Sequence, residues 1–280
     1  MFYTRLTVTC PPDFLEIIMA EVAEAGFESF METEEGFEAY VENEKFDGRY
    51  LLHIQERYSH VMPLIFSQDR VQKQNWNEEW EKNVEPIVVD EKCLVRASFH
   101  QIEKKYPYEI VITPKMSFGT GHHQTTHLML KSMMRMDYEN KNVMDAGCGT
   151  AILSIMASKL GAKSVEAFDI DEWSIVNGKE NAEVNHCANI NIRQGKIAEL
   201  SFDTSFDIVL ANINRNILLA EMQEYANALS PGGHLLLSGF YSTDIPVLAA
   251  AASHHGLQEV FHDERENWAA VLFVKNNAKN

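Results

Sequence analysis

The stretch that decides the fold reads Asn142-Val-Met-Asp-Ala-Gly-Cys-Gly-Thr150, continues through an apolar segment to Leu160, and ends in Ser164-Val-Glu-Ala-Phe-Asp-Ile-Asp171. Its first and last parts are short apolar runs typical of buried strands, and its middle has apolar residues at helical spacing. A glycine turn joins the first strand to the helix, and an acid ends the second strand. This order predicts a strand–helix–strand unit with a ligand site at its first turn.

The acidic residues of this stretch indicate which ligand to expect. Asp169 lies 22 residues after Gly147, at the tip of the second strand, where a carboxylate can accept hydrogen bonds from both ribose hydroxyls of a nucleoside. A dinucleotide site would have a third glycine in place of Ile152, and it would not place the anionic Asp145 beside a pyrophosphate. A cofactor with a cationic amino-acid end fits better, and S-adenosylmethionine is one. The alternative is an ordinary strand–turn–helix without a ligand, which the two acids in register disfavour.

The composition favours a basic macromolecular partner. The chain has 280 residues, enough for one large domain or two ordinary ones, and a formal net charge of −17. A net negative charge of this size argues against binding to nucleic acid through its phosphates. We find neither a run long enough to span a membrane nor a signal peptide, and we therefore expect a soluble cytoplasmic protein that acts as a monomer.

Metal binding is not expected. The four cysteines, at positions 10, 93, 148 and 187, have neither metal-ligand nor disulfide spacing, and Cys148 is expected to be a small buried residue rather than a nucleophile. His123 and His127 stand four residues apart, as in the zinc motif His-Glu-x-x-His, but Gln124 replaces the required glutamate and no third ligand is indicated.

The first 66 residues are predicted to form a small α+β domain. Strands are expected at 2–9, 27–34, 36–43 and 50–55, and helices at 14–25 and 58–66. The region has 13 Asp/Glu and 4 Lys/Arg, a net charge of −9. This acidic surface is either a solvated face or a docking surface for a positively charged macromolecule.

A helical linker is predicted over residues 67–85, with Trp76 and Trp80 on one face, and a second domain over residues 86–280. Two short strands are expected within 87–99 and another at 108–113. The glycine-rich turn at residues 119–121 follows and suits a loop that closes over a ligand.

Beyond residue 171, helices and strands alternate with short loops. Helices are expected at 173–185, 216–229 and 243–255, and strands at 189–194, 207–213, 234–240, 257–264 and 268–275. This alternation predicts a doubly wound, mainly parallel α/β sheet in which one of the two closing strands runs antiparallel. Ligands bind such sheets at the carboxyl ends of the strands where the strand order reverses, which brings Gly147, Asp169 and Asn212 around one crevice.

These residues together resemble one family, the bacterial methyltransferases of large-subunit ribosomal protein eleven. The likeness covers most of the chain from Trp76 onward. It rests on Asn75-Trp-Asn-Glu-Glu-Trp with Glu85-Pro, Phe118-Gly-Thr-Gly-His with Thr125-Thr126, Val143-Met-Asp-Ala-Gly-Cys-Gly, Phe168-Asp-Ile-Asp, Ala211-Asn-Ile and Leu237-Ser-Gly. The family loop usually reads His-Pro-Thr-Thr, whereas Gln124 replaces the proline here, and residues 1–66 show no specific match.

The resemblance implies a seven-stranded, Rossmann-like methyltransferase sheet, a small amino-terminal domain for substrate recognition, and S-adenosylmethionine as cofactor. It places Thr126, Gly147, Asp169 and Asn212 at the cofactor contacts. The implied reaction moves a methyl group to amine nitrogens, on lysine or the N-terminal amine, of ribosomal protein eleven. Because the pKa of a lysine amine is about 10.4, the site must remove a proton or favour the neutral amine by desolvation. The sequence identifies no general base.

Alternative functions are separated by particular residues. An Asn/Asp-Pro-Pro-aromatic motif after the fourth strand would indicate methylation of an amide or base nitrogen, but Asn212-Ile-Asn-Arg215 lacks those prolines. A methyltransferase of another protein or of a small molecule stays open, as does a nucleoside-binding regulator without activity, although a small-molecule enzyme would not need the acidic domain. Asn212 either orients the cofactor or the amine, or only ties the strand end to its loop.

Overall fold

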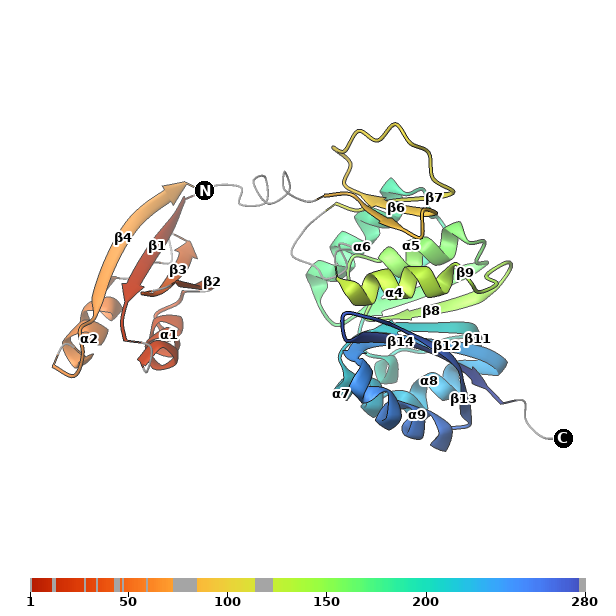
Figure 1. Ribbon diagram of the computed structural model, residues 1–280. Helices are drawn as coiled ribbons and strands as arrows, with labels where there is room; N and C mark the ends of the chain where they lie inside the picture. The colour runs from red at the N-terminus through yellow and green to blue at the C-terminus, as the bar shows by residue number, and fades with distance from the viewer. Residues whose placement is uncertain are drawn as a thin grey trace. The chain divides into compact units, whose positions relative to one another are not determined.

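The computed structural model describes residues 2–276 apart from 12–13, 28, 34, 43–45, 47, 59, 73–84 and 114–122. The chain divides into two compact units, residues 1–82 and residues 83–280 (Figure 1). Among the described residues, no helix combines the length and the apolar character that crossing a membrane requires.

The amino-terminal unit is a four-stranded antiparallel sheet, in the order β2-β3-β1-β4, with two helices. Its elements are β1 (Phe2–Thr9), α1 (Leu15–Glu24), β2 (Ser29–Thr33), β3 (Gly36–Glu42), α2 (Gly48–Tyr58) and β4 (Ile65–Gln72). Alternate residues of β1 and β3 are buried, as expected of strands with one covered face. They share one core with apolar residues of both helices, including Ile18, Val22, Leu51 and Ile54.

Two of the expected elements in this unit are wrong. Residues 50–55, expected to form a strand, lie in helix α2, in which Leu51 and Ile54 are buried one turn apart. Residues 58–66, expected to form a helix, contain only the last residue of α2 and the start of β4. Strand β4 continues to Gln72 and pairs with β1 along its length, so residues 67–72 belong to the sheet and not to a helical linker. The remainder of the expected linker, 73–84, lies outside the described residues.

The carboxy-terminal unit is built on a seven-stranded sheet in the order β10-β9-β8-β11-β12-β14-β13. Its strands are β8 (Asn142–Ala146), β9 (Ser164–Asp169), β10 (Ile190–Gln194), β11 (Phe206–Asn212), β12 (Leu229–Tyr241), β13 (Leu257–Arg265) and β14 (Trp268–Lys275). Only β14 runs antiparallel to its neighbours, and the other pairs in this sheet are parallel. The expected doubly wound sheet with an antiparallel closing strand is confirmed, and the strand order reverses between β8 and β11.

Helices cover both faces of this sheet (Figure 1). They are α4 (Gln124–Met133), α5 (Ile152–Lys159) and α6 (Glu172–Val184) on one face, and α7 (Arg215–Ala220), α8 (Met222–Ala228) and α9 (Ile245–His254) on the other, with short 3-10 turns at Ile197–Glu199 and Ser242–Asp244. The central strands are buried almost throughout, because a parallel sheet with helices on both sides has no solvated face.

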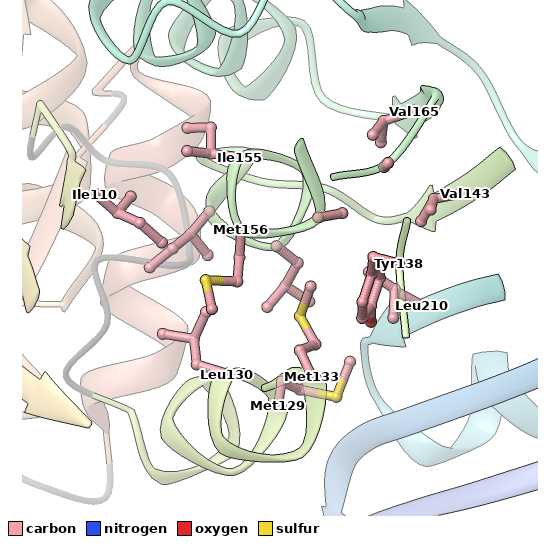
Figure 2. Close-up of a cluster of buried hydrophobic side chains, with 14 of the residues drawn as sticks. Ile110, Met129, Leu130, Met133, Tyr138, Val143, Ile155, Met156, Val165 and Leu210 are labelled. Atoms are coloured by element: carbon pink, nitrogen blue, oxygen red, sulfur yellow. The ribbon is translucent and has the colours of Figure 1, made fainter. Parts of the chain in front are cut away.

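A further layer of three short strands packs on the outside of α4 and α5. Strands β5 (Ile87–Val89) and β6 (Cys93–Arg96) are antiparallel, and β7 (Tyr108–Val111) pairs with β6 in parallel. Apolar residues of these strands share one core with α4 and α5. Figure 2 shows Met156 of α5 pointing toward Leu130 of α4, with Ile110 of β7 nearby. The first helix layer is therefore enclosed by a sheet on each side.

Candidate functional site

The glycine turn lies at the carboxyl end of β8 and is fastened to the end of β9. The backbone N–H groups of Gly147 and Cys148 both donate to the carbonyl oxygen of Phe168, at 2.9 and 3.0 Å. The Cys148 side chain is buried and burial raises its thiol pKa well above the usual value, which agrees with a packing role. The turn therefore holds its place through backbone bonds between neighbouring strands.

Asp169 ends β9 and is held by the backbone on both carboxylate oxygens. Oδ2 accepts the N–H of Gly149 at 2.9 Å, and Oδ1 accepts the N–H of Asp171 at 3.0 Å. The residue is only partly buried, and each carboxylate oxygen can accept more than one hydrogen bond. Asp169 thus presents a fixed pair of acceptors beside the turn, an arrangement suited to two adjacent hydroxyls.

Asp145 lies in β8 just before the turn and is fully buried. The hydroxyl of Ser154, on α5, donates to its Oδ2 at 2.5 Å. Its Oδ1 is buried and has no hydrogen-bond partner among the described residues. Burial is the main cause that raises the pKa of this carboxyl to about 6, and the charge of Asp169 adds to it. An uncompensated buried carboxylate oxygen is costly, and a cationic group would relieve that cost.

Asn212 ends β11 and touches Thr126 of α4. The Asn212 side-chain N–H donates to Thr126 Oγ1 over a long 3.5 Å, and Thr126 is fully buried. The side-chain carbonyl of Asn212 is buried without a hydrogen-bond partner in the described part of the chain. It is therefore available as an acceptor at the carboxyl edge of the sheet.

Ile213, the residue after Asn212, lies between two glycines that fix its path. A Cβ on Gly147 would stand 2.4 Å from Ile213 Cγ2, and a Cβ on Gly239 would stand 2.2 Å from the Ile213 carbonyl oxygen. Gly239 also has a φ of +95° and lies at a register shift in β12. The four residues expected at the site therefore form two pairs, Gly147 with Asp169 and Asn212 with Thr126. Ile213 connects the two pairs.

An aromatic cluster of His123, Tyr241 and Trp268 lies at the same edge. The ring of Trp268 is 4.6 Å from that of His123 and 4.3 Å from that of Tyr241. His123 caps α4 by accepting the N–H of Thr125 on Nδ1, and burial lowers the pKa of its ring below the usual value. His123 precedes Thr126 by three residues at the start of α4, so the backbone of His123 lies about one helical turn from that of Thr126.

Comparison with known proteins places the chain among its relatives. The family model described as Ribosomal protein L11 methyltransferase (PrmA) matches residues 16–276. The chain belongs to this family. A ribosomal protein L11 methyltransferase from Phocaeicola vulgatus is 41% identical, over 98% of this chain and 99% of the relative. One from Porphyromonas gingivalis is 44% identical, over 94% of this chain and 92% of the relative. The resemblance seen in the sequence is confirmed.

Solved structures agree on the methyltransferase fold. The ribosomal protein L11 methylase from Lactobacillus delbrueckii subsp. bulgaricus is 28% identical, with a TM-score of 0.64 over 69% of this chain and 100% of that chain. A methyltransferase from Pyrococcus furiosus, 16% identical, has a TM-score of 0.50 over 60% of this chain and 89% of that chain, and it shows the fold alone. The expected methyltransferase sheet is confirmed.

In this member of the L11 methyltransferase family, reasoning from the sequence did not predict three residues of the candidate site: Ser154, Tyr241 and Trp268. Ser154 lies on the buried face of α5 and gave no signal, because a serine in a helix is ordinarily a surface residue. Trp268 could have been noticed, since a tryptophan opening the antiparallel strand must lie at the carboxyl edge of its parallel neighbours. The loop at residues 119–121, expected to close over a ligand, lies outside the described residues.

Proposed function

We propose that this methyltransferase moves methyl groups from S-adenosylmethionine to amine nitrogens of ribosomal protein L11, on lysine side chains, the N-terminal amine, or both. The names of its relatives support the substrate, and the candidate site at the ends of β8, β9 and β11 supports this edge of the sheet as the place of reaction.

The observation that carries the cofactor assignment is the pairing of two acids with different surroundings beside one turn. Asp169 has both oxygens fixed and accessible, as required to accept two ribose hydroxyls. Asp145 has an oxygen without a described partner, which a cationic ammonium group would compensate, directly or through a water. Gly147, Thr126 and Asn212 complete the expected cofactor contacts. A dinucleotide would place a pyrophosphate, and not a cation, near Asp145.

The residues of this chain prepare the acceptor nitrogen. S-adenosylmethionine, when bound, supplies a methyl group on a sulfonium, and its transfer forms an N–C bond, breaks the C–S bond and leaves a thioether. The incoming amine must present a free lone pair, so its proton must leave before attack. The Asn212 carbonyl is suited to accept an N–H of the neutral amine and so to aim the lone pair.

The aromatic cluster supports an amine on a long apolar stem. Tyr241 is about half exposed, at 51%, and its ring lies 4.3 Å from that of Trp268, which is partly buried. Such a surface attracts the alkyl chain of a lysine by burial, and its low polarity favours the neutral amine over the ammonium ion.

A binding and transfer experiment tests the proposal. Isothermal titration of the protein with S-adenosylmethionine should show one site. Incubation with cofactor carrying a labelled methyl group should label ribosomal protein L11 in a ribosomal protein extract. Binding without any labelled protein would leave the cofactor assignment standing and refute the substrate. The absence of binding would refute both.

A further inference from the structure

Helix α6 has a row of three buried asparagines that the site described above does not use. Asn177 and Asn181 in α6, and Asn185, which caps its carboxyl end, recur every four residues, so they lie on one face of the helix. Their exposed fractions are 1%, 0% and 8%. A buried amide must find hydrogen-bond partners, and three in one row indicate a polar attachment to neighbouring backbone.

The outer asparagine of the row binds the free edge of β7. Asn185 Oδ1 accepts the N–H of Val111 at 2.9 Å, and its Nδ2 donates to the Val111 carbonyl at 2.6 Å. Strand β7 pairs with β6 on its other edge. The amide of Asn185 therefore takes the place of a neighbouring strand, and its hydrogen bonds go to Val111 and to the Asn181 carbonyl rather than to the glycine turn.

Asn181, one turn closer to the sheet edge, links two segments. Its Oδ1 accepts the N–H of Thr113 at 2.9 Å, and its Nδ2 donates to the carbonyl of Thr150 at 3.0 Å and to Asn177 Oδ1 at 3.3 Å. Asn177 Nδ2 lies 3.4 Å from the Thr113 carbonyl. Thr150 belongs to the glycine turn, so Asn181 ties that turn to the segment that follows β7.

The backbone of α6 also approaches the turn directly at Gly178. A Cβ at this position would stand 3.2 Å from Ile192 Cδ1, and 3.3 Å from both the carbonyl oxygen of Gly149 and Ala151 Cβ. These distances are tighter than ordinary packing, so the turn and the helix fit together with little room. Helix α6 therefore supports the turn at two adjacent places, through the Asn181 side chain and through its backbone at Gly178.

We propose that Asn181 is a positioning residue for the cofactor, an inference that rests on the proposed use of S-adenosylmethionine. Asn181 holds Thr150, and Gly149, the residue before it, donates the N–H that fixes Asp169 Oδ2. A displaced Thr150 carbonyl shifts the Gly149 donor and, with it, the acceptor pair that Asp169 presents to the ribose. Asn181 thus acts on the cofactor through the turn, without touching it.

The test compares three variants by titration with S-adenosylmethionine and by thermal unfolding. Asn181→Ala removes the bonds to Thr113 and Thr150. Asn185→Ala removes a comparable set of buried bonds from the same row but none to the turn. Gly178→Ala disturbs the same support without leaving a buried polar group unpaired, and it raises the helix propensity of α6. All three are measured well below their unfolding temperatures.

We expect Asn181→Ala and Asn185→Ala to lower the unfolding temperature by similar amounts, while only Asn181→Ala and Gly178→Ala weaken cofactor binding, by at least fivefold. In steady-state assays, the KM for the cofactor should rise for these two variants with kcat nearly unchanged, because a binding contact has been disturbed and not the transition state.

Two results would overturn the inference. One is unchanged cofactor affinity in Asn181→Ala and Gly178→Ala, and the other is a loss of affinity in Asn185→Ala as large as that in Asn181→Ala. If Asn181→Ala does not fold, Asn181→Asp takes its place in the test, because it keeps the acceptor for the Thr113 N–H and removes the donor to the Thr150 carbonyl. Failure of the wild-type protein to bind S-adenosylmethionine would instead refute the proposed function on which the inference depends.

Discussion

The protonation state that is favoured at the Asp145 carboxyl differs with and without a bound ligand. Without a cation nearby, burial favours the protonated carboxyl and raises its pKa from 3.8 to about 6. With a cationic group at its free oxygen, the anion is favoured instead. The strand therefore carries a residue that destabilises the empty fold at neutral pH, as binding sites commonly do.

The pH dependence of stability tests this reading of Asp145. A carboxyl whose pKa is raised in the folded state stabilises the fold fully below its unfolded pKa, and this contribution is lost as the pH rises through about 6. Relative to Asp145→Asn, the wild-type free energy of unfolding should fall by roughly 2 kcal/mol between about pH 4 and pH 7. Urea unfolding of both proteins across this range measures the difference. Parallel pH profiles would show that Asp145 does not titrate there.

Replacing Asp169 tests the ribose assignment. Asp169→Ala should weaken S-adenosylmethionine binding by about 1.5–3 kcal/mol, because charge-assisted hydrogen bonds are lost. Asp171→Ala is a matched control, since Asp171 caps α6 by accepting from the N–H and hydroxyl of Ser174. The control should cost about 1 kcal/mol of stability and leave affinity unchanged. If calorimetry shows that Asp169→Ala binds S-adenosylmethionine with wild-type affinity, the Asp169 carboxylate does not bind the ribose.

Between elements, the path of β11 into its loop depends on the close approach of β12. Gly239→Ala should destabilise the protein by several kcal/mol and weaken cofactor binding, because the new Cβ meets the Ile213 backbone, which cannot move without moving Asn212. Gly256→Ala is the control, since Gly256 has a φ of +77° but its Cβ would meet nothing within 4 Å. Backbone strain alone should cost the control about 1–2 kcal/mol.

Denaturant unfolding and calorimetry of both variants separate strain from collision. If Gly239→Ala and Gly256→Ala lose equal stability, the Ile213 backbone moves aside for the new Cβ at little cost. The close approach of Gly239 to Ile213 would then not position Asn212.

Most elements of the carboxy-terminal unit were predictable because its pattern is strong, although the helix expected at 216–229 is two helices, α7 and α8, and β12 begins at Leu229 and not at residue 234. Buried parallel strands are continuous apolar runs, and the helices between them have apolar residues at regular spacing. The amino-terminal unit was harder, since the run Tyr50-Leu-Leu suits a strand as well as a helix, and the burial that decides between them comes from contacts with β1 and β3. The asparagine row on α6 had a visible signal, amides every four residues, but their partners on β7 and just after it lie about 70 residues away.

The candidate site was predictable where a single sequence motif positions a residue. It was not predictable where residues from distant segments of the chain come together. The end of β9 follows from the order of strands and places Asp169 beside the glycine turn. Thr126 was expected only through resemblance, since nothing in α4 predicts its contact with Asn212. Ser154 and Trp268 come from different elements, and their positions depend on helix rotation and strand register, which local sequence does not determine.

For the whole molecule, we propose that the amino-terminal unit delivers the substrate and takes no part in cofactor binding. Its acidic residues suit a basic protein partner. A protein beginning at Asn83 is the appropriate truncation, because a start at Ser67 would keep β4 without β1, with which it pairs. The truncated protein should bind S-adenosylmethionine with wild-type affinity and lose most methylation of ribosomal protein L11. Undiminished turnover on that substrate would refute the delivery role.

The most direct test of the central claim is the intact mass of ribosomal protein L11 after incubation with this protein and S-adenosylmethionine. The mass should increase by one or more whole methyl groups, and fragmentation should place them on lysine side chains or the N-terminal amine. Asp169→Ala at the same cofactor concentration should slow the increase. An unchanged mass of ribosomal protein L11, with the cofactor shown to bind, would contradict the account.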